Sequence, residues 1–368
     1  MSDFVSVPLR RSLVAGFEFF AMVMSLGQAL AGDSSSQSGS VGATVTAAAP
    51  VISNFDMKDT SGSPATIIGT QIVVLTTYTF NFRVNAPNGW TDVTHVYARV
   101  WHDGGNDATA YTGQTTGANY RASLASTYSG ASAPAVGDFS AVDGNLQYVQ
   151  GSSSVTQVVL GQTYDFVLAF QYHAQMRAAK TPTTLSTSSY NNANSWNAEI
   201  EVTDVSANDV FQPQQAGTND YFEFGVATYT SVTFTGPWTA TANIAPGGNS
   251  NTNAVTITRI SNFDFQLYAY FSTDLIKQGD ATKTIPVASN VKILQTGDMG
   301  GDGTFTGTGT GNKVYVLGSA TPTYHTMDAN ADSGTVSVTF NIAVPLGTSA
   351  GTYQGTVFFT VQQQTPLP

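Results

Sequence analysis

The chain is dominated by alternation of apolar and polar residues from Val51 onward. The alternation is regular in TYTFNFRV at 77–84, in WNAEIEV at 196–202 and in TVSVTFNIAV at 335–344. Because successive side chains of a strand point to opposite faces of a sheet, this period predicts strands with one buried and one solvated face. Clusters such as APNG, HDGGND and PGGNSN separate the strands and supply turn geometry.

Helices contribute little to the predicted fold. The best candidate after residue 31 is YHAQMRAAK at 172–180, which is long enough for one or two turns. Many short strands with one apolar face are most simply buried by packing two sheets against each other. The pattern predicts an all-β protein with two antiparallel, immunoglobulin-like β-sandwich domains, which follow an N-terminal signal helix and an extended linker.

Domain boundaries follow from a break in the alternation. The stretch SANDVFQPQQAGTND at 206–220 is polar and rich in turn residues. We expect it to link a first domain at 50–205 to a second domain at 221–363, with a short tail at 364–368. Both domains are larger than a minimal immunoglobulin-like sandwich of about 100 residues. Long loops are therefore expected, and 103–150 is the obvious insertion in the first domain.

The N-terminus has the features of a secretory signal peptide. Arg10 and Arg11 precede an apolar run at 12–31 that ends in Ala-Leu-Ala, the small-residue pattern of a cleavage site. Glu18 interrupts this run, which leaves a type IV pilin leader, a twin-arginine signal and an uncleaved anchor as alternatives. We expect the signal peptide to comprise residues 1–31. No other apolar segment approaches the ~20 residues of a spanning helix, so we expect no membrane partner after cleavage.

Residues 32–49, GDSSSQSGSVGATVTAAA, carry only small or polar side chains and a single charge, at Asp33. Such a composition is typical of a flexible linker. The part that runs into Val51 has an alternating character and no bulky side chain. The segment is therefore also a candidate donor strand, which would add to the open sheet edge of a neighbouring subunit.

Three stretches resemble a known group of proteins. The opening AAAPVISNFDM at 47–57 and the segment TYTFNFRVNAPNGWTDVTHVYARVW at 77–101 look like the immunoglobulin-like modules of secreted prokaryotic, especially archaeal, surface proteins and filament subunits. The closing VPLGTSAGTYQGTVFFTV at 344–361 matches the group's last hairpin. The chain departs from the group at Asn85, where the turn usually has Asp. Two further patches carry the same resemblance, WNAEIEVTD at 196–204 and the segment from ANIAPGG to YFSTDL at 242–275. Together the patches extend over about half of the mature chain, and the resemblance implies a β-sandwich fold and an extracellular location.

The word ISNFD occurs twice, at 52–56 and at 260–264. The first copy follows Pro50 and is expected to open a domain as an edge strand. The second copy is expected to form a corner between two strands inside a domain. The sequences that follow the two copies differ, so the word does not indicate two domains in register.

Charge and cysteine content exclude several classes of function. Charged residues make up 10% of the chain, with 24 acidic and 13 basic residues and a net charge of −11. No basic patch is available to hold a phosphate backbone, so we expect no nucleic-acid partner. The chain has no Cys, which excludes disulfides, zinc-thiolate sites and cysteine nucleophiles.

No group of residues indicates a catalytic reaction. The four histidines show no metal-ligand spacing, and no G-x-S-x-G motif is present. The only glutamates after the leader are Glu199, Glu201 and Glu223, and each lies in a predicted strand. A carboxylate pair for glycoside hydrolysis needs only two suitably placed acids, but this pattern favours a protein that is not an enzyme.

Acidic turns provide the one candidate for a bound ion. Asp and Asn at alternate positions of a tight loop can direct oxygen atoms inward, as in calcium loops. The candidate calcium ligands are Asp328, Asn330 and Asp332 in MDANADSG, Asp298 and Asp302 in GDMGGDG, and the similar pair Asp103 and Asp107 in HDGGND. The first loop lacks the Gly and the later Glu of an EF-hand. The alternative is that these residues simply stabilise turns. Calcium is the only candidate cofactor.

Two classes of function remain. A nearly uncharged polar surface suits a structural protein that polymerises with itself into a filament, sheath or surface layer, because burying unpaired charge is costly. Alternatively, the protein is a secreted adhesin or carbohydrate-binding protein whose aromatic residues stack on cell-surface glycans. The candidate tryptophans are Trp90, Trp101, Trp196 and Trp238, although Trp196 alternates with apolar residues as a core residue does. Both classes place the protein outside the cell or at its surface.

Overall fold

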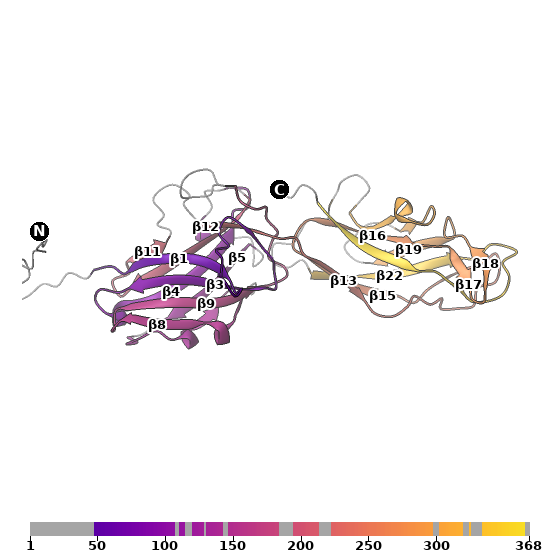
Figure 1. Ribbon diagram of the computed structural model, residues 1–368. Coiled ribbons are helices and arrows are strands. Elements are labelled where there is room, and N and C mark those ends of the chain that lie inside the picture. The colour runs from indigo at the N-terminus through magenta and orange to yellow at the C-terminus, as the bar shows by residue number, and fades with distance from the viewer. Residues whose placement is uncertain are drawn as a thin grey trace, which may run out of the picture. The chain divides into compact units, whose positions relative to one another are not determined.

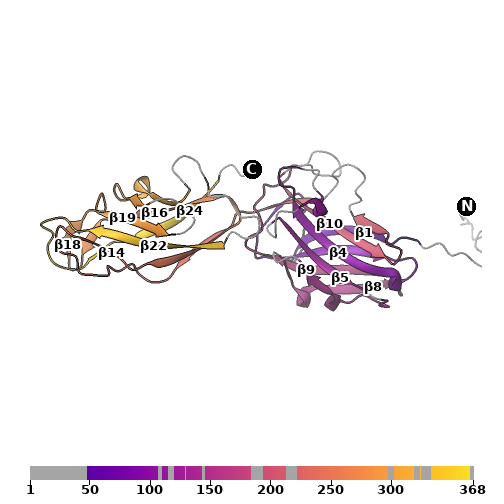
Figure 2. The ribbon, with the colours of Figure 1, turned by 180° about the vertical axis from the view of Figure 1, so that it is seen from behind.

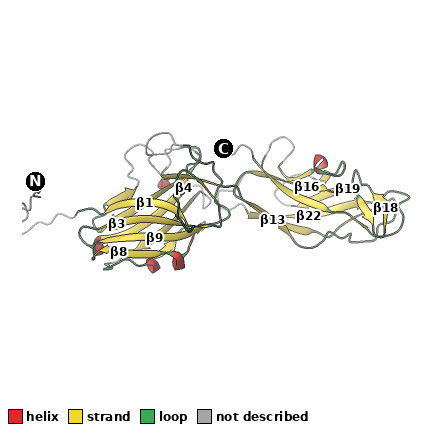
Figure 3. Ribbon diagram, viewed as in Figure 1, coloured by secondary structure: helices red, strands yellow, loops and turns green. Residues whose placement is uncertain are grey.

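The computed structural model describes most of the chain after residue 47. The described residues are 48–106, 110–114, 120–128, 130–142, 146–183, 194–212, 222–296, 302–318, 324 and 333–364. Strands make up 53% of the structure, and the helical segments of the described residues are three-residue 3-10 turns (Figure 3). The predicted all-β class with antiparallel sheets is confirmed. The predicted signal peptide and residues 32–47 lie outside the described residues.

The first sheet has five strands, all antiparallel to their neighbours. It consists of β1 (Val51–Asp59), β3 (Thr77–Asn85), β9 (Thr163–Tyr172) and β7 (Leu146–Tyr148) in that order, with β8 (Ser154–Val159) also paired to β9. Figure 1 shows β1, β3, β9 and β8 side by side. The strands β7 and β8 therefore form one end of the sheet, and β1 forms the other.

The second sheet has seven strands. Its order is β2 (Gln71–Ile72), β12 (Phe222–Val226), β10 (Trp196–Asp204), β4 (Val93–His102), β5 (Arg121–Thr127) and β6 (Phe139–Ala141), with β11 (Asp209–Gln212) also paired to β10. The pairing of β2 with β12 is parallel and the others are antiparallel. Figure 2 shows β10, β4 and β5 from behind.

These two sheets share one hydrophobic core, as the alternation predicts. Phe82 on β3 stacks on Phe166 of β9, with ring centroids 4.8 Å apart. From the second sheet, Ala98 and Ile200 are fully buried in the same cluster. Trp90 adds an indole packed edge-on to Tyr164 at 5.1 Å. The polar residues between these positions face away from the core.

The strands after residue 229 form a six-stranded, a three-stranded and a second three-stranded sheet around a second hydrophobic cluster. The largest is β13 (Thr230–Phe234), β15 (Val255–Ser261), β22 (Ser333–Ala343), β19 (Val291–Thr296) and β20 (Gly303–Thr304), with β14 (Asn249–Asn251) on β22. The others are β21 (Val314–Leu317), β16 (Phe265–Phe271) and β24 (Val357–Gln363), and β18 (Asp280–Ile285), β17 (Leu275–Lys277) and β23 (Tyr353–Gln354).

Short 3-10 turns join some of the strands. They are η1 (Trp90–Asp92), η2 (Tyr111–Gly113), η3 (Val136–Asp138), η4 (Gln150–Ser152) and η5 (Thr310–Asn312). The segment at 172–180, the best helical candidate of the sequence, contains no helix. Instead, Ala179 forms an antiparallel bridge with Val226. Among the described residues there is no helix with the length and hydrophobicity needed to cross a bilayer.

The strand pairing differs from the predicted boundary at 206–220. Val210 in β11 pairs with Val202, and Phe222 in β12 pairs with Ala198, so both strands belong to the sheet of the first core. Val210 and Phe222 are partly buried against that core, which explains why the chain returns to it. Residues 47–368 form one compact unit with two hydrophobic clusters, and the division into two domains stays a prediction.

The two copies of ISNFD have different structures. The first lies in β1, at the end of the sheet, where the register shifts between Ser53 and Asp56 and Asn54 has a φ of +56°. The second forms the corner between β15 and β16, and Asn262 is fully buried there. An edge strand and a corner are what the sequence predicts for these copies.

Candidate functional site

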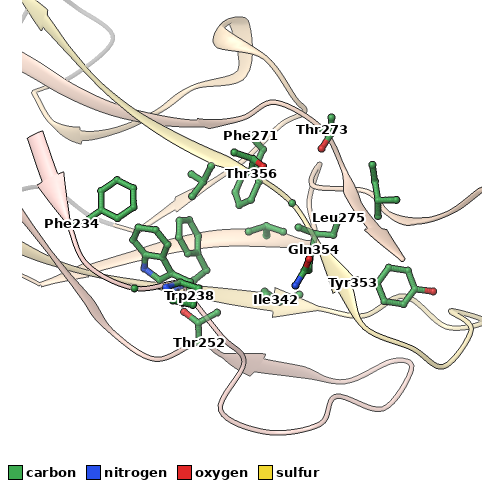
Figure 4. Close-up of a pocket in the computed structure, with 17 residues that line it drawn as sticks. Phe234, Trp238, Thr252, Phe271, Thr273, Leu275, Ile342, Tyr353, Gln354 and Thr356 are labelled. Carbon is green, nitrogen blue, oxygen red and sulfur yellow. Dashed lines mark hydrogen bonds between the residues drawn. The ribbon is translucent and has the colours of Figure 1, made fainter. Parts of the chain in front are cut away.

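A groove lined by apolar and uncharged polar residues opens into the core of the C-terminal strands, with a volume of about 580 Å³ (Figure 4). One wall includes Phe234, the last residue of β13, and Trp238, which follows that strand. The other wall includes Tyr353 of β23 and Val357 of β24. Buried core residues line its interior, namely Phe271, Leu275, Val291 and Phe340. A volume of this size is typical of ligand sites, which lie between roughly 300 and 1,000 Å³.

Contacts with β22 and β24 hold Trp238 in place at this groove. Its Nε1 donates a hydrogen bond of 2.9 Å to the carbonyl of Val338 in β22. Its ring stacks on Phe359 of β24 at 5.5 Å and meets Phe340 edge-on at 5.3 Å. The indole thus contacts both sheets that border the groove, and Figure 4 shows it beside Phe234. Buried aromatic contacts of this kind hold a wall in one position.

The wall formed by β23 and β24 packs closely against Leu275 and Phe271 because it contains a glycine, Gly355. A Cβ built on Gly355, between β23 and β24, would lie 2.7 Å from Cδ2 of Leu275 and 3.4 Å from Cδ1 of Phe271. The first distance is shorter than van der Waals contact allows, and the second is at its lower limit. Any larger residue at Gly355 would push Leu275 or the wall away.

Two strand edges border the groove. Within the described residues, β24 pairs with β16 alone and β13 pairs with β15 alone. No residue that lines the groove carries a charge. An unpaired strand edge next to an uncharged apolar cavity is suited to an extended, uncharged peptide segment, because added strands gain backbone hydrogen bonds from the edge and specificity from pockets.

A second unusual region lies on the face of the seven-stranded sheet that is turned away from the core. There Arg99 of β4 forms ion pairs with Glu199, at 3.5 Å, and with Glu201 of β10. The guanidinium lies 4.4 Å from the ring centre of Tyr97 and 4.9 Å from that of Tyr111. Cation–π contacts add to the ion pairs, so Arg99 is held by two carboxylates and two rings.

Burial changes the ionisation of this region. Burial raises the pKa of Glu199 to about 7, although the positive charge of Arg99 acts to lower this pKa. Nearby, burial and the charge of Arg177 lower the pKa of His102 to about 3, and its Nδ1 accepts a hydrogen bond from the N–H of Gly104. His102 is therefore a neutral core residue. No group of three metal-binding side chains occurs among the described residues.

The structure describes only part of the predicted calcium sites. Asp302 is exposed in the described chain. Asp103 is buried and accepts hydrogen bonds from Ser195, at 3.2 Å, and from Asn197. These bonds are of the kind expected if Asp103 stabilises a turn instead of binding calcium. Asp107, Asp298, Asp328, Asn330 and Asp332 lie outside the described residues, so calcium binding there stays a prediction.

The aromatic residues divide into core and surface. Trp90, Trp101 and Trp196 are at most 1% exposed and cannot stack on a sugar. A surface row was not singled out from the sequence. It crosses β21, β16 and β24 and consists of Tyr315, Tyr268, Tyr270 and Phe358, with neighbouring ring centres 5.3–6.4 Å apart and Lys313 over the first two rings.

Sequence reasoning placed several residues correctly but missed the groove. The three glutamates lie on strands, as predicted, and His95 also lies on a strand. The groove was missed because its walls are distant in sequence, Phe234 to Trp238 on one side and Tyr353 to Val357 on the other. The available signal was the run TGPWTA, in which a tryptophan follows a turn instead of alternating within a strand.

Comparisons with known proteins leave the family open. No family model matches the chain, and no curated protein matches it. Among solved structures, the C-terminal domain of the Streptococcus pyogenes antigen I/II-family protein AspA is similar, with a TM-score of 0.23 and 11% identity over 83% of this chain and 95% of that chain. A likeness at that TM-score carries no argument about this chain.

Proposed function

We propose that this protein is a non-enzymatic, extracellular structural subunit that assembles with copies of itself into a filament, sheath or surface layer. The observation that carries the proposal is the groove between Trp238 and β24, which leaves the core of the C-terminal strands accessible beside two unpaired strand edges. In this proposal the groove of one subunit receives an added strand from the segment 32–49 of the next subunit.

The sequence of the donor segment suits this groove. In VGATVTA at 41–47, Val41, Ala43 and Val45 alternate with Gly and Thr, which gives one small apolar side and one polar side. Burying a valine side chain contributes roughly 1.5–3 kcal/mol. The segment carries no charge between Asp33 and Asp56, so its insertion requires no desolvation of an ion.

The length of the donor segment sets how far it can extend. Eighteen extended residues span about 60 Å. The C-terminal end of the segment is held by Asn88, whose Nδ2 donates to the carbonyl of Ala48 at 2.9 Å and whose Oδ1 accepts from its N–H at 3.3 Å. The described chain therefore begins at a point fixed by Asn88, three residues before β1.

Electron microscopy and sedimentation of the chain 32–368 test this proposal. We expect polymers from the full mature chain, and folded protein that forms no polymers from a chain that begins at residue 50. Val45→Asp should also abolish polymers, because it would bury a charge in the groove. Thr44→Asp is the matched control on the polar side of the segment and should leave polymers intact. Polymers formed by the chain 50–368 would contradict strand addition.

Cysteine pairs distinguish exchange between subunits from insertion within one subunit. The chain has no Cys, so Val45→Cys on one molecule and Ile342→Cys on another give an unambiguous cross-link. Mixing the two single variants should yield a disulfide-linked dimer of chains. A cross-link that forms only when both cysteines lie on the same chain would show that the segment fills its own groove, which would rule out the assembly.

The adhesin alternative is favoured by one observation, the aromatic row at Tyr268, Tyr270 and Phe358. Sugar rings stack on aromatic side chains, and Lys313 with Gln362 supplies polar groups beside the row. Binding of the unpolymerised Val45→Asp chain to a glycan array, lost in Tyr270→Ala but kept in Phe234→Ala, would support this second function.

A further inference from the structure

The strand β8 is an open edge at the far end of the first sheet from β1. It pairs with β9 alone among the described residues (Figure 1). Five of its six residues are exposed, and Val155 is the one that is partly buried. Val158 and Val159 are 45% and 47% exposed, and Leu160 in the following turn is 85% exposed. The edge is thus both apolar and uncovered in the described chain.

This edge has no charged residue and no proline to protect it, and its regular pairing runs from Ser154 to Gln157. Natural sheets protect edge strands with charges, prolines, bulges that twist the edge away, or a covering segment. The sequence from Gly144 to Tyr164 contains no charged residue and no proline. The register shift between Gln157 and Val159 is the only irregularity in the β8 pairing. An edge of this type is expected to pair with another strand.

Among the edge strands with five or more residues in the described chain, those other than β8 are protected or already assigned. β1 carries Asp56, Lys58 and Asp59 and a register shift. β18 carries Asp280 and Lys283. The uncharged strands β13 and β24 border the groove of the proposed function. β8 therefore remains as a long, uncharged edge with no role in that assembly.

We propose that β8 pairs with β8 of a second copy of this chain, antiparallel and about a twofold axis, which joins two five-stranded sheets into one. An antiparallel edge is complementary to itself because each strand presents the same row of donors and acceptors to the other. The absence of charge means that two copies with a net charge of −11 meet without like charges at the contact. The exposed Val158, Val159 and Leu160 would be covered in the process.

This pairing uses a different edge from strand addition, so either contact can fail without the other. Strand addition would connect subunits along a polymer, and β8 pairing would connect one polymer to another. The second contact is the one that would convert single filaments into bundles or a sheet.

Cysteine scanning of the complete mature chain tests the pairing. Directly opposed residues of antiparallel strands have Cα atoms about 4.5–5.5 Å apart, within the range that a disulfide bridges. We expect Thr156→Cys, Gln157→Cys or Val158→Cys to form a disulfide dimer at least tenfold faster than Thr284→Cys, an exposed position on the charged edge strand β18. Equal rates at all positions would overturn the proposal.

A lysine on the edge provides the second test, in the Val45→Asp background that blocks strand addition. Sedimentation should show a dimer for this chain and at least a tenfold weaker dimer when Val158→Lys is added, whereas Thr284→Lys should leave the dimer unchanged. Circular dichroism should be the same for all three chains. A monomer without Val158→Lys, or a dimer that Val158→Lys does not weaken, would refute β8 pairing.

Discussion

Asn262 Oδ1 accepts a hydrogen bond of 2.6 Å from the backbone N–H of Tyr229, in the short connection between β12 and β13. Its Nδ2 donates to the carbonyl of Ala227 at 2.9 Å, and its own carbonyl accepts from the N–H of Ala178 at 2.6 Å. One buried residue of the second ISNFD copy therefore fixes the strand connection and the end of the 172–180 segment. A side chain that satisfies buried backbone groups is costly to replace.

Asn262→Asp should destabilise the protein by about 2 kcal/mol or more at neutral pH, because a buried carboxylate would face the carbonyl of Ala227. Asn54→Asp is the matched control in the other copy of the word, where the side chain is exposed and Asp tolerates positive φ. It should change the free energy of unfolding by no more than ~0.5 kcal/mol. Urea denaturation measures both, and equal effects would contradict this role of Asn262.

Stability should fall as pH rises toward 7. Burial raises the pKa of Glu199 from 4.5 to about 7 in the folded chain, so folding takes up a proton between these values. The stabilisation is complete below pH 4.5 and is lost as pH rises through 7, by on the order of 3 kcal/mol. Glu199→Gln should remove this slope in urea denaturation from pH 4 to 8. Asp302→Asn, at an exposed site, should retain it.

Loss of Arg99 should be more harmful than loss of an exposed arginine. Arg99→Met would leave Glu199 and Glu201 buried without a cation, which typically costs 3–5 kcal/mol. Arg83→Met is the control, since Arg83 and Asp165 form an ion pair in which both side chains are more than a third exposed. Such pairs are worth about 0–1 kcal/mol. Adding Glu199→Gln and Glu201→Gln to Arg99→Met should recover most of the lost stability in thermal unfolding.

Gly225→Ala should disrupt the docking of β12. A Cβ at this position would lie 2.4 Å from the carbonyl oxygen of Lys180 and 2.9 Å from that of Ala179, and backbone atoms cannot move aside as a side-chain end can. We expect a loss of at least ~2 kcal/mol. Gly311→Ala, where a Cβ would meet nothing within 4 Å, should be within ~0.5 kcal/mol of the parent chain in the same thermal-unfolding measurement.

Much of the strand content could be predicted because the alternation is itself the physical cause of the sheets. Tyr78, Phe80, Phe82 and Val84 are all buried, as their period requires. The pairing of β11 with β10 and of β12 with β10 could not be predicted. The two strands have four and five residues and are separated by a polar stretch, so they show too few alternations. Their place depends on long-range contacts with β10.

The candidate site was less accessible to sequence reasoning. Glu199 and Glu201 alternate with apolar residues, so the sequence placed them on the solvated face of a strand, yet that face is covered. Nothing local in WNAEIEV indicates the cover, since Tyr111 comes from a distant loop.

The donor role of 32–49 was inferred from composition alone, and the groove that would receive it became visible only in the arrangement of the strands.

The uncharged lining of the groove has a thermodynamic consequence for the proposed polymer. Association through apolar surface has a negative heat-capacity change and is weakly affected by salt, because no ion pairs are formed or screened. Hydrophobic contacts also weaken on cooling. Polymers held by this groove should therefore tolerate wide changes in salinity and come apart first in the cold.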